Sequence, residues 1–236
     1  MTATDGQTTE PLYIAVIGDL VDSRSLPDRA RVQRKLVETL ERYNEKAEAS
    51  IASRFLVTLG DEFQGLLRSS ASVSDFWWFY QEQMHAVAPT RLGFGLGPLA
   101  TDLLEEALGM DGPCFHAARS AIKGARAGKL QLAFGVASRR EMTEILNRVS
   151  RPIERLSRGW SEVQWQTAAG LSRGWSQVEI AAERNVKRQS VNDVVRASLG
   201  MEVRDAWRGV DELIKFFARA WGQGSGPGRT GTGASS

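Results

Sequence analysis

Three carboxylates within the first 62 residues have the surroundings needed for metal or phosphate chemistry. Asp61 and Glu62 are adjacent acids that follow Gly60 in "VTLGDEFQGLL", between two apolar runs. Asp19 follows another apolar run in "LYIAVIGDLV". Carboxylates that are brought together repel, and keeping them charged is costly unless a cation lies between them. Oxygen ligands of this kind suit Mg²⁺, which keeps several waters and shares its coordination with phosphates.

Alternating strands and helices are expected around these acids. Apolar β-branched runs predict strands, and helical spacing of apolar residues predicts helices. The strands are expected over residues 12–21, 53–59, 63–67, 90–99 and 129–136, and the helices over 25–49, 72–87 and 114–128. The order β-α-β-β-α-β, with additions, predicts an α+β fold with a ferredoxin-like or palm domain. In such a sheet the end of the first strand lies beside the later hairpin turn, so Asp19 is expected near Asp61.

The segment that follows Asp19 offers contacts for a triphosphate. In "GDLVDSR", residues Asp22 and Ser23 supply backbone N–H groups, and Arg24 supplies a guanidinium. Gly60, in the hairpin turn, permits close approach of a ligand to the backbone. These four residues are the predicted nucleotide contacts.

Several motifs resemble known families. Asp19 after a buried strand, the Gly60-Asp61 hairpin, the strand "RLGFGLG" and "GPCFHAARSA" look like the class III nucleotide cyclase fold, and "GDEF" matches four of the five letters of the diguanylate cyclase signature. With "GDLVDSR" and "TLGDEFQGLL", most of residues 12–215 resemble the SatD family, bacterial proteins that pair such a domain with a helix-turn-helix. The resemblance implies that Asp19 and Asp61, with Glu62 as a third ligand, hold Mg²⁺. It also implies that Arg119 lies near the phosphates of ATP or GTP.

Two departures from the cyclase pattern touch catalytic contacts. Phe115 stands where cyclases carry an asparagine, four residues before Arg119, and Leu59 replaces the first glycine of the diguanylate signature. The metal pair is intact, which favours binding of a purine nucleotide without cyclisation. Two alternatives stay open: a nucleotide cyclase or related phosphoryl-transfer enzyme, and a degenerate palm used only for dimerisation. Arg119 has an alternative as well, a salt bridge to Glu105 or Glu106.

A second motif lies toward the C-terminus. "SQVEIAAERNVKRQSVNDVVRASL" has apolar residues spaced for two short helices around a turn at Asn185, and it resembles the helix-turn-helix of response regulators and sigma factors. An earlier helix is expected over 160–170, and a helical hairpin without a DNA role is the alternative. The residue types suit phosphates and base edges. The predicted DNA contacts are Arg173, Lys187, Arg188, Gln189, Ser190, Asn192 and Arg196.

Composition divides the chain into segments. The formal net charge is +2, and Lys and Arg outnumber Asp and Glu over residues 151–220 but not over 1–150. The expected organisation is a disordered N-terminus over 1–11, a palm domain over 12–150, a helix-turn-helix domain over 151–220 and a disordered Gly/Ser-rich tail over 221–236. An amphipathic helix over 203–217 is expected to pack on its own domain or on a second copy.

The sequence also suggests a compartment and partners. A single cysteine, Cys114, indicates a reducing environment, and there is neither a signal-peptide pattern nor an apolar run long enough to span a membrane. A cytoplasmic protein is therefore expected. The functional prediction is a transcription regulator in which a purine nucleotide alters binding to double-stranded DNA. A homodimer that reads a pseudo-palindrome is expected, since both kinds of module commonly act as two-fold dimers.

Overall fold

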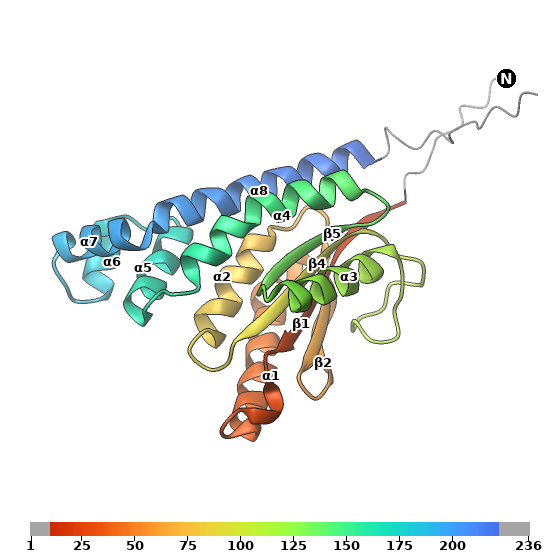
Figure 1. Ribbon diagram of the computed structural model, residues 1–236, viewed down its shortest axis with the longest axis horizontal. Helices are drawn as coiled ribbons and strands as arrows, with labels where there is room; N and C mark the ends of the chain where they lie inside the picture. Colours follow the sequence, from red (N-terminus) through yellow and green to blue (C-terminus); the bar gives the residue numbers. More distant parts are fainter. Residues whose placement is uncertain (1–9, 222–236) are drawn as a thin grey trace, which may run out of the picture.

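A computed structural model describes residues 10–221 and shows a mixed α+β fold (Figure 1). Most of the two terminal segments expected to be disordered, residues 1–9 and 222–236, lie outside the described residues. Five strands form one sheet in the order β2-β3-β1-β4-β5, in which β1 pairs antiparallel with β3 and β4, and β4 pairs parallel with β5. The strands are β1 (Leu12–Leu20), β2 (Ile51–Leu59), β3 (Glu62–Arg68), β4 (Thr90–Pro98) and β5 (Leu132–Val136).

Eight α-helices in the described residues accompany the sheet. They are α1 (Arg29–Lys46), α2 (Val73–Met84), α3 (Pro113–Gly128), α4 (Arg140–Ser157), α5 (Glu162–Ser172), α6 (Gln177–Glu183), α7 (Arg188–Ser198) and α8 (Gly200–Ala220). The elements expected up to residue 136 are present in the expected chain order. Helix α4 is an additional element that was not expected, although Leu146, Val149, Ile153 and Leu156 have helical spacing.

The pleat of β1 separates two hydrophobic layers. Ile14 and Val16 belong to the layer that includes α1 and α2, whereas Ala15 and Ile17 pack with α3 on the other face. Because side chains alternate along a strand, Asp19 follows Ile17 on the α3 face. The end of β1 thus points its carboxylate toward the same side of the sheet as α3.

Glycines on β4 allow α3 to lie directly on the sheet. Gly93, Gly95 and Gly97 are the register partners of alternate β1 residues on the α3 face. A Cβ atom on Gly95 would lie 2.1 Å from the Cys114 carbonyl oxygen and 2.3 Å from the Ala118 nitrogen. Only glycine permits this approach of helix backbone to strand. The alternating "RLGFGLG" pattern therefore fixes the position of α3 and of every charged side chain on it.

Helices α4, α5 and α8 contribute side chains to the main core of the sheet layer. Tryptophans from α2 pack against tryptophans of the C-terminal half, with ring centroids 5.4 Å apart for Trp77 and Trp165 and 4.9 Å apart for Trp77 and Trp207. The expected boundary at residues 150/151 falls inside α4, which packs along α8 (Figure 1). Burial of large aromatic surface therefore joins α2 to α5 and α8, which lie on the other side of residue 150 in the chain.

A polar contact reinforces this junction. Asp211 of α8 is buried and accepts hydrogen bonds from the Ser74 N–H at 3.2 Å and the Ser74 hydroxyl at 2.6 Å, at the N-terminus of α2. The Ser72 hydroxyl donates to the same carboxylate at 2.5 Å. A carboxylate at a helix N-terminus satisfies free N–H groups and favours the helix dipole. A side chain of α8 therefore caps α2.

Three apolar residues that contribute to the helical spacing of the sequence are exposed in the structure. Val37 on α1 is 40% exposed, Val178 on α6 is 60% exposed, and Val186 in the following turn is 39% exposed. Each belongs to a helix or turn whose buried face is already filled by neighbouring residues. The expected amphipathic face of α8 is confirmed at Val203, Trp207, Val210, Ile214 and Phe217, which are buried, and it packs within the chain.

Candidate functional site

Charged side chains form a row across three adjacent strands. Glu62 in β3 and Arg91 in β4 are the two register partners of Asp19 in β1. Register partners on antiparallel strands point to the same face, which here is the face covered by α3. The expected proximity of acidic side chains at the end of β1 is therefore present, but an arginine completes the row.

Asp19 is buried, with only 5% of its surface exposed. Its Oδ2 atom accepts a hydrogen bond from Arg126 in the last turn of α3. Its Oδ1 atom lies 3.7 Å from the Arg91 Nη1 atom and has no hydrogen-bond partner. A buried carboxylate oxygen without a hydrogen bond is costly, so this atom marks a place where a further group can bind.

The hairpin turn is held against the end of β1. The Leu20 N–H donates to the Asp61 carbonyl oxygen at 3.1 Å, and the Ser23 hydroxyl donates to the Asp61 carboxylate. Gly60 adopts φ +60°, a conformation that favours glycine, and its carbonyl oxygen accepts from the Gln33 side chain at 2.7 Å. These contacts bring Asp61 next to the segment that follows Asp19, as the sequence predicts.

The electrostatic state of Glu62 reflects its neighbours. Burial raises the pKa of the Glu62 carboxyl above 4.5, and the charge of Asp19 raises it further. Arg119 and Arg126 act in the opposite direction on this pKa, and Asp61 adds to the increase. A further positive charge near Glu62 would therefore stabilise its ionised form.

The remaining predicted nucleotide contacts are spread around this row. Asp22 is exposed and has φ 50°, and Arg24 is exposed in the short 3₁₀ turn after β1. Arg119 lies on α3 with its Nη1 atom 3.7 Å from the Asp111 Oδ1 atom. Its ion-pair partner is therefore Asp111, not the Glu105 or Glu106 considered from the sequence.

The acidic residues do not by themselves form a complete metal site. Within residues 10–221, no three His, Cys, Asp or Glu side chains are arranged so that they could hold a metal ion. A partial set of oxygen ligands is present in Asp19, Asp61 and Glu62. The Oδ1 atom of Asp19 has no hydrogen-bond partner. Mg²⁺ commonly uses one or two carboxylates and completes its coordination with water and phosphates, so the residues fit a metal that arrives with a nucleotide.

Sequence reasoning missed Arg91 and Arg126. Arg126 lies two helical turns after Arg119, so a helical projection would have placed both on one face of α3. The opening Arg91 of the "RLGFGLG" strand carried no signal by itself, because only the register of β1 and β4 sets it opposite Asp19.

The second candidate site is the α6–α7 pair. Ser176 caps α6 through a capping box with Glu179, and Asn185, at φ 50°, turns the chain toward α7. A small core from α5 to α7 holds the three helices together, and it consists of Leu171, Ile180, Ala181, Val191 and Val195, with Trp175 packed against it. The helix, tight turn and second helix expected from the sequence are therefore present in the structure.

Most of the predicted DNA contacts lie at exposed positions of α7, four of them at its start and Arg196 in its last turn. Lys187, Arg188, Gln189, Ser190 and Arg196 are exposed, and Asn192 is half-buried. The Gln189 amide donates a hydrogen bond to the Asp193 carboxylate at 2.9 Å. This bond holds the Asp193 side chain against the surface of α7. Arg173 differs, because its guanidinium pairs with Glu82 of α2 and lies 5.1 Å from the Trp175 ring centroid. The structure thus groups the α7 residues and ties Arg173 to the sheet layer.

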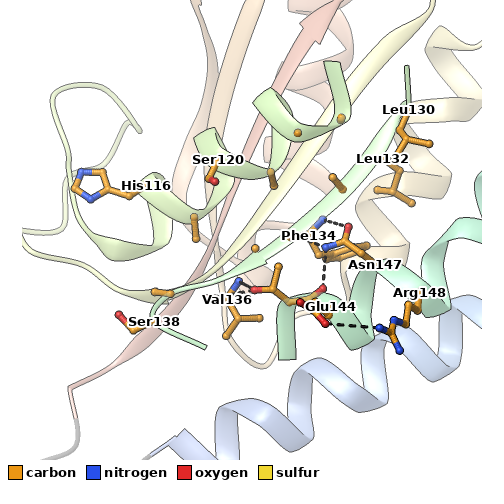
Figure 2. A pocket seen from close by; sticks show the side chains of 18 of the residues that line it. His116, Ser120, Leu130, Leu132, Phe134, Val136, Ser138, Glu144, Asn147 and Arg148 are labelled. Atoms are coloured by element: carbon orange, nitrogen blue, oxygen red, sulfur yellow. Dashed lines mark hydrogen bonds and ion pairs between the residues drawn. The ribbon is translucent and has the colours of Figure 1, made fainter. Parts of the chain in front are cut away.

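A groove beside β5 contains none of the predicted site residues (Figure 2). It has a volume of about 940 Å³ and lies between α3 and α4, over β5. Asn147 and Thr143 of α4 hydrogen-bond the outer backbone of β5, at Phe134 and Val136 respectively. These contacts satisfy the edge strand and prevent further strand pairing there.

Comparison with known proteins identifies the family. The model of the SatD family matches residues 13–204. The chain belongs to the SatD family. No curated protein matches this SatD-family chain. Among solved structures, it is similar to a regulator of polyketide synthase expression from Bifidobacterium adolescentis, at 15% identity and a TM-score of 0.27, over 92% of this chain and 82% of that one. Among residues 10–221, no helix of this SatD-family chain has the length and apolar character needed to cross a membrane.

Proposed function

We propose that this protein is a DNA-binding transcription regulator whose sheet layer binds a purine nucleotide with Mg²⁺. The observation that carries the proposal is the exposed start of α7, at Lys187, Arg188, Gln189 and Ser190. The small core shared by α5, α6 and α7 holds this helix in place. A second helix placed this way can enter the major groove, where arginine and glutamine recognise guanine and adenine edges.

The nucleotide part of the proposal rests on the charged row at the end of β1. Asp19, Asp61 and Glu62 would hold Mg²⁺, which would supply positive charge to the phosphates. Arg24, Arg119 and the backbone after Asp19 would contact the phosphates themselves. The Asp19 Oδ1 atom supports this assignment, since it has no hydrogen-bond partner and a bound cation would satisfy it.

Coupling between the two sites would act through a homodimer. The tryptophan contacts make the sheet layer, α5 and α8 parts of one packed unit, and the α5–α7 core attaches α6 and α7 to α5. A nucleotide would therefore change DNA affinity by favouring one arrangement of two copies over another. A ligand that binds both arrangements equally would shift nothing.

A phosphoryl-transfer enzyme is the second candidate. It is favoured by the same Asp19 Oδ1 atom, which has no hydrogen-bond partner. One contact implied by the cyclase resemblance is missing, because Phe115 is fully buried between α3 and the sheet. That side chain cannot contact a substrate, so binding without cyclisation is the better-supported function.

Fluorescence anisotropy on DNA from the upstream region of the gene tests the proposal. Binding is measured at fixed salt, with and without Mg²⁺ and ATP or GTP, for the wild type and Asp61→Asn. Specific, salt-sensitive binding that a nucleotide shifts only in the wild type is the expected result. If specific DNA binding is absent under every condition, the regulator role is wrong. Consumption of ATP or GTP that Asp19→Asn abolishes would then favour the enzyme.

A further inference from the structure

Arg126 and Asp19 form an ion pair between a very exposed side chain and a buried one. The Arg126 side chain is 65% exposed, whereas the Asp19 side chain is 7% exposed. Arg126 lies in the last turn of α3 and reaches the carboxylate by the length of its side chain alone. By contrast Arg91, the other basic neighbour of Asp19, is 17% exposed and is fixed by the pairing of β4 with β1.

The two contacts with Asp19 differ in how easily they break. An exposed arginine regains water when it leaves a carboxylate, and such ion pairs contribute little net stability. The buried Asp19 cannot follow it, because its strand is paired on both sides. Removal of Arg126 leaves only the Arg91 ion pair to compensate the buried carboxylate, which favours binding of another cation at Asp19.

The local balance of charge indicates what replaces Arg126. Asp19, Glu62 and Asp61 contribute negative charge at the end of β1, and both Glu62 and Asp61 act electrostatically on Arg126. A divalent cation at Asp19 would make the guanidinium redundant at that carboxylate. The phosphates that accompany the cation would then be the strongest acceptors within its reach.

We propose that Arg126 is an internal counter-ion that occupies Asp19 in the ligand-free protein, competes with divalent cations, and transfers to the phosphates when a metal–nucleotide complex binds. This inference rests on the metal and nucleotide role proposed above. Arg126 would keep free Mg²⁺ from filling the site without nucleotide. Arg126 would thus couple binding of the cation to binding of the nucleotide. The cation would displace Arg126 from Asp19, and the phosphates of the nucleotide would accept the displaced guanidinium.

The test compares Mn²⁺ binding by electron paramagnetic resonance with binding of Mg²⁺–ATP and Mg²⁺–GTP by calorimetry. Arg126→Gln is expected to bind free Mn²⁺ roughly threefold to tenfold more tightly than the wild type, and to bind the metal–nucleotide complexes more weakly. Lys123→Gln removes one charge from an exposed position on the same helix and is the matched control. Arg126→Lys keeps the charge and should stay close to the wild type for Mn²⁺.

The possible results distinguish the counter-ion role of Arg126 from the metal site itself. If Asp19→Asn abolishes Mn²⁺ binding but Arg126→Gln does not strengthen it, the counter-ion role is wrong and the metal site stands. If Arg126→Gln strengthens both Mn²⁺ and nucleotide binding, the transfer to phosphate is wrong. If neither the wild type nor Arg126→Gln binds Mn²⁺, the metal site and the counter-ion role are both wrong. Circular dichroism verifies that each variant is folded.

Discussion

Asp19 and Glu62 are directly opposed on β1 and β3, so two carboxylates share one face of the sheet. Antiparallel register partners of like charge destabilise a sheet unless other groups offset the repulsion. Here Arg91 and Arg126 both form ion pairs with Asp19, whereas the pKa of Glu62 is raised by its burial and by the charge of Asp19. This pair leaves repelling negative charges at the end of β1, which is where the proposed cation would bind.

Glu62→Gln should stabilise the protein at neutral pH. A raised pKa means that the folded protein holds the Glu62 proton more tightly than the unfolded chain. The group therefore favours folding at low pH, and this contribution is lost as the pH rises through the folded pKa. We expect a higher Tm for Glu62→Gln at neutral pH and convergence with the wild type as the pH falls toward 4.5. The exposed Glu45→Gln is the control, and a pH-independent difference would contradict the assignment.

Arg188→Ala should weaken specific DNA binding by about 1–3 kcal/mol if this side chain contacts a base edge. The reason is the loss of a guanidinium at the exposed start of α7. Arg140→Ala removes an arginine from the start of α4 whose side chain is 91% exposed, and it should leave affinity unchanged. Anisotropy titrations at one salt concentration measure both variants. Equal affinities would remove Arg188 from the DNA interface.

Gly95→Ala should destabilise the fold strongly, by about 3 kcal/mol or more. A Cβ at this position meets the backbone of α3, which cannot move aside without lifting the helix from β4. Gly124→Ala is the matched control, because a Cβ there has nothing within 4 Å and lies inside α3. That change should stabilise the helix by about 0.5–1 kcal/mol. Urea denaturation of both variants distinguishes close packing from a general intolerance of alanine.

Asp211→Ala should cost about 1–3 kcal/mol, because it removes the acceptor for two hydroxyls and one N–H at the start of α2. The exposed neighbour Glu212→Ala should change stability by less than about 0.5 kcal/mol. Hydrogen exchange would show the loss of protection in both α2 and α8. Loss confined to α8 would mean that the cap does not join the two parts of the chain.

The sequence by itself determined the local elements and part of the charged site. Apolar runs and helical spacing were sufficient for the five strands and most helices, because each pattern reflects a face that must be buried. The Gly60-Asp61-Glu62 turn and the α6–α7 pair were also found, since both depend on residues close together in the chain. The helix α4 was missed although its apolar residues have helical spacing.

Only the tertiary structure decided how these parts meet. The pairing of Arg91 and Arg126 with Asp19, the attachment of Arg173 to Glu82, and the cap from Asp211 on α2 all join residues far apart in the chain. The packing of Trp77 against Trp165 and Trp207 likewise joins residues on the two sides of residue 150. Such contacts depend on strand register and on packing between distant segments, whereas the sequence pattern records which faces are buried and not what each face packs against.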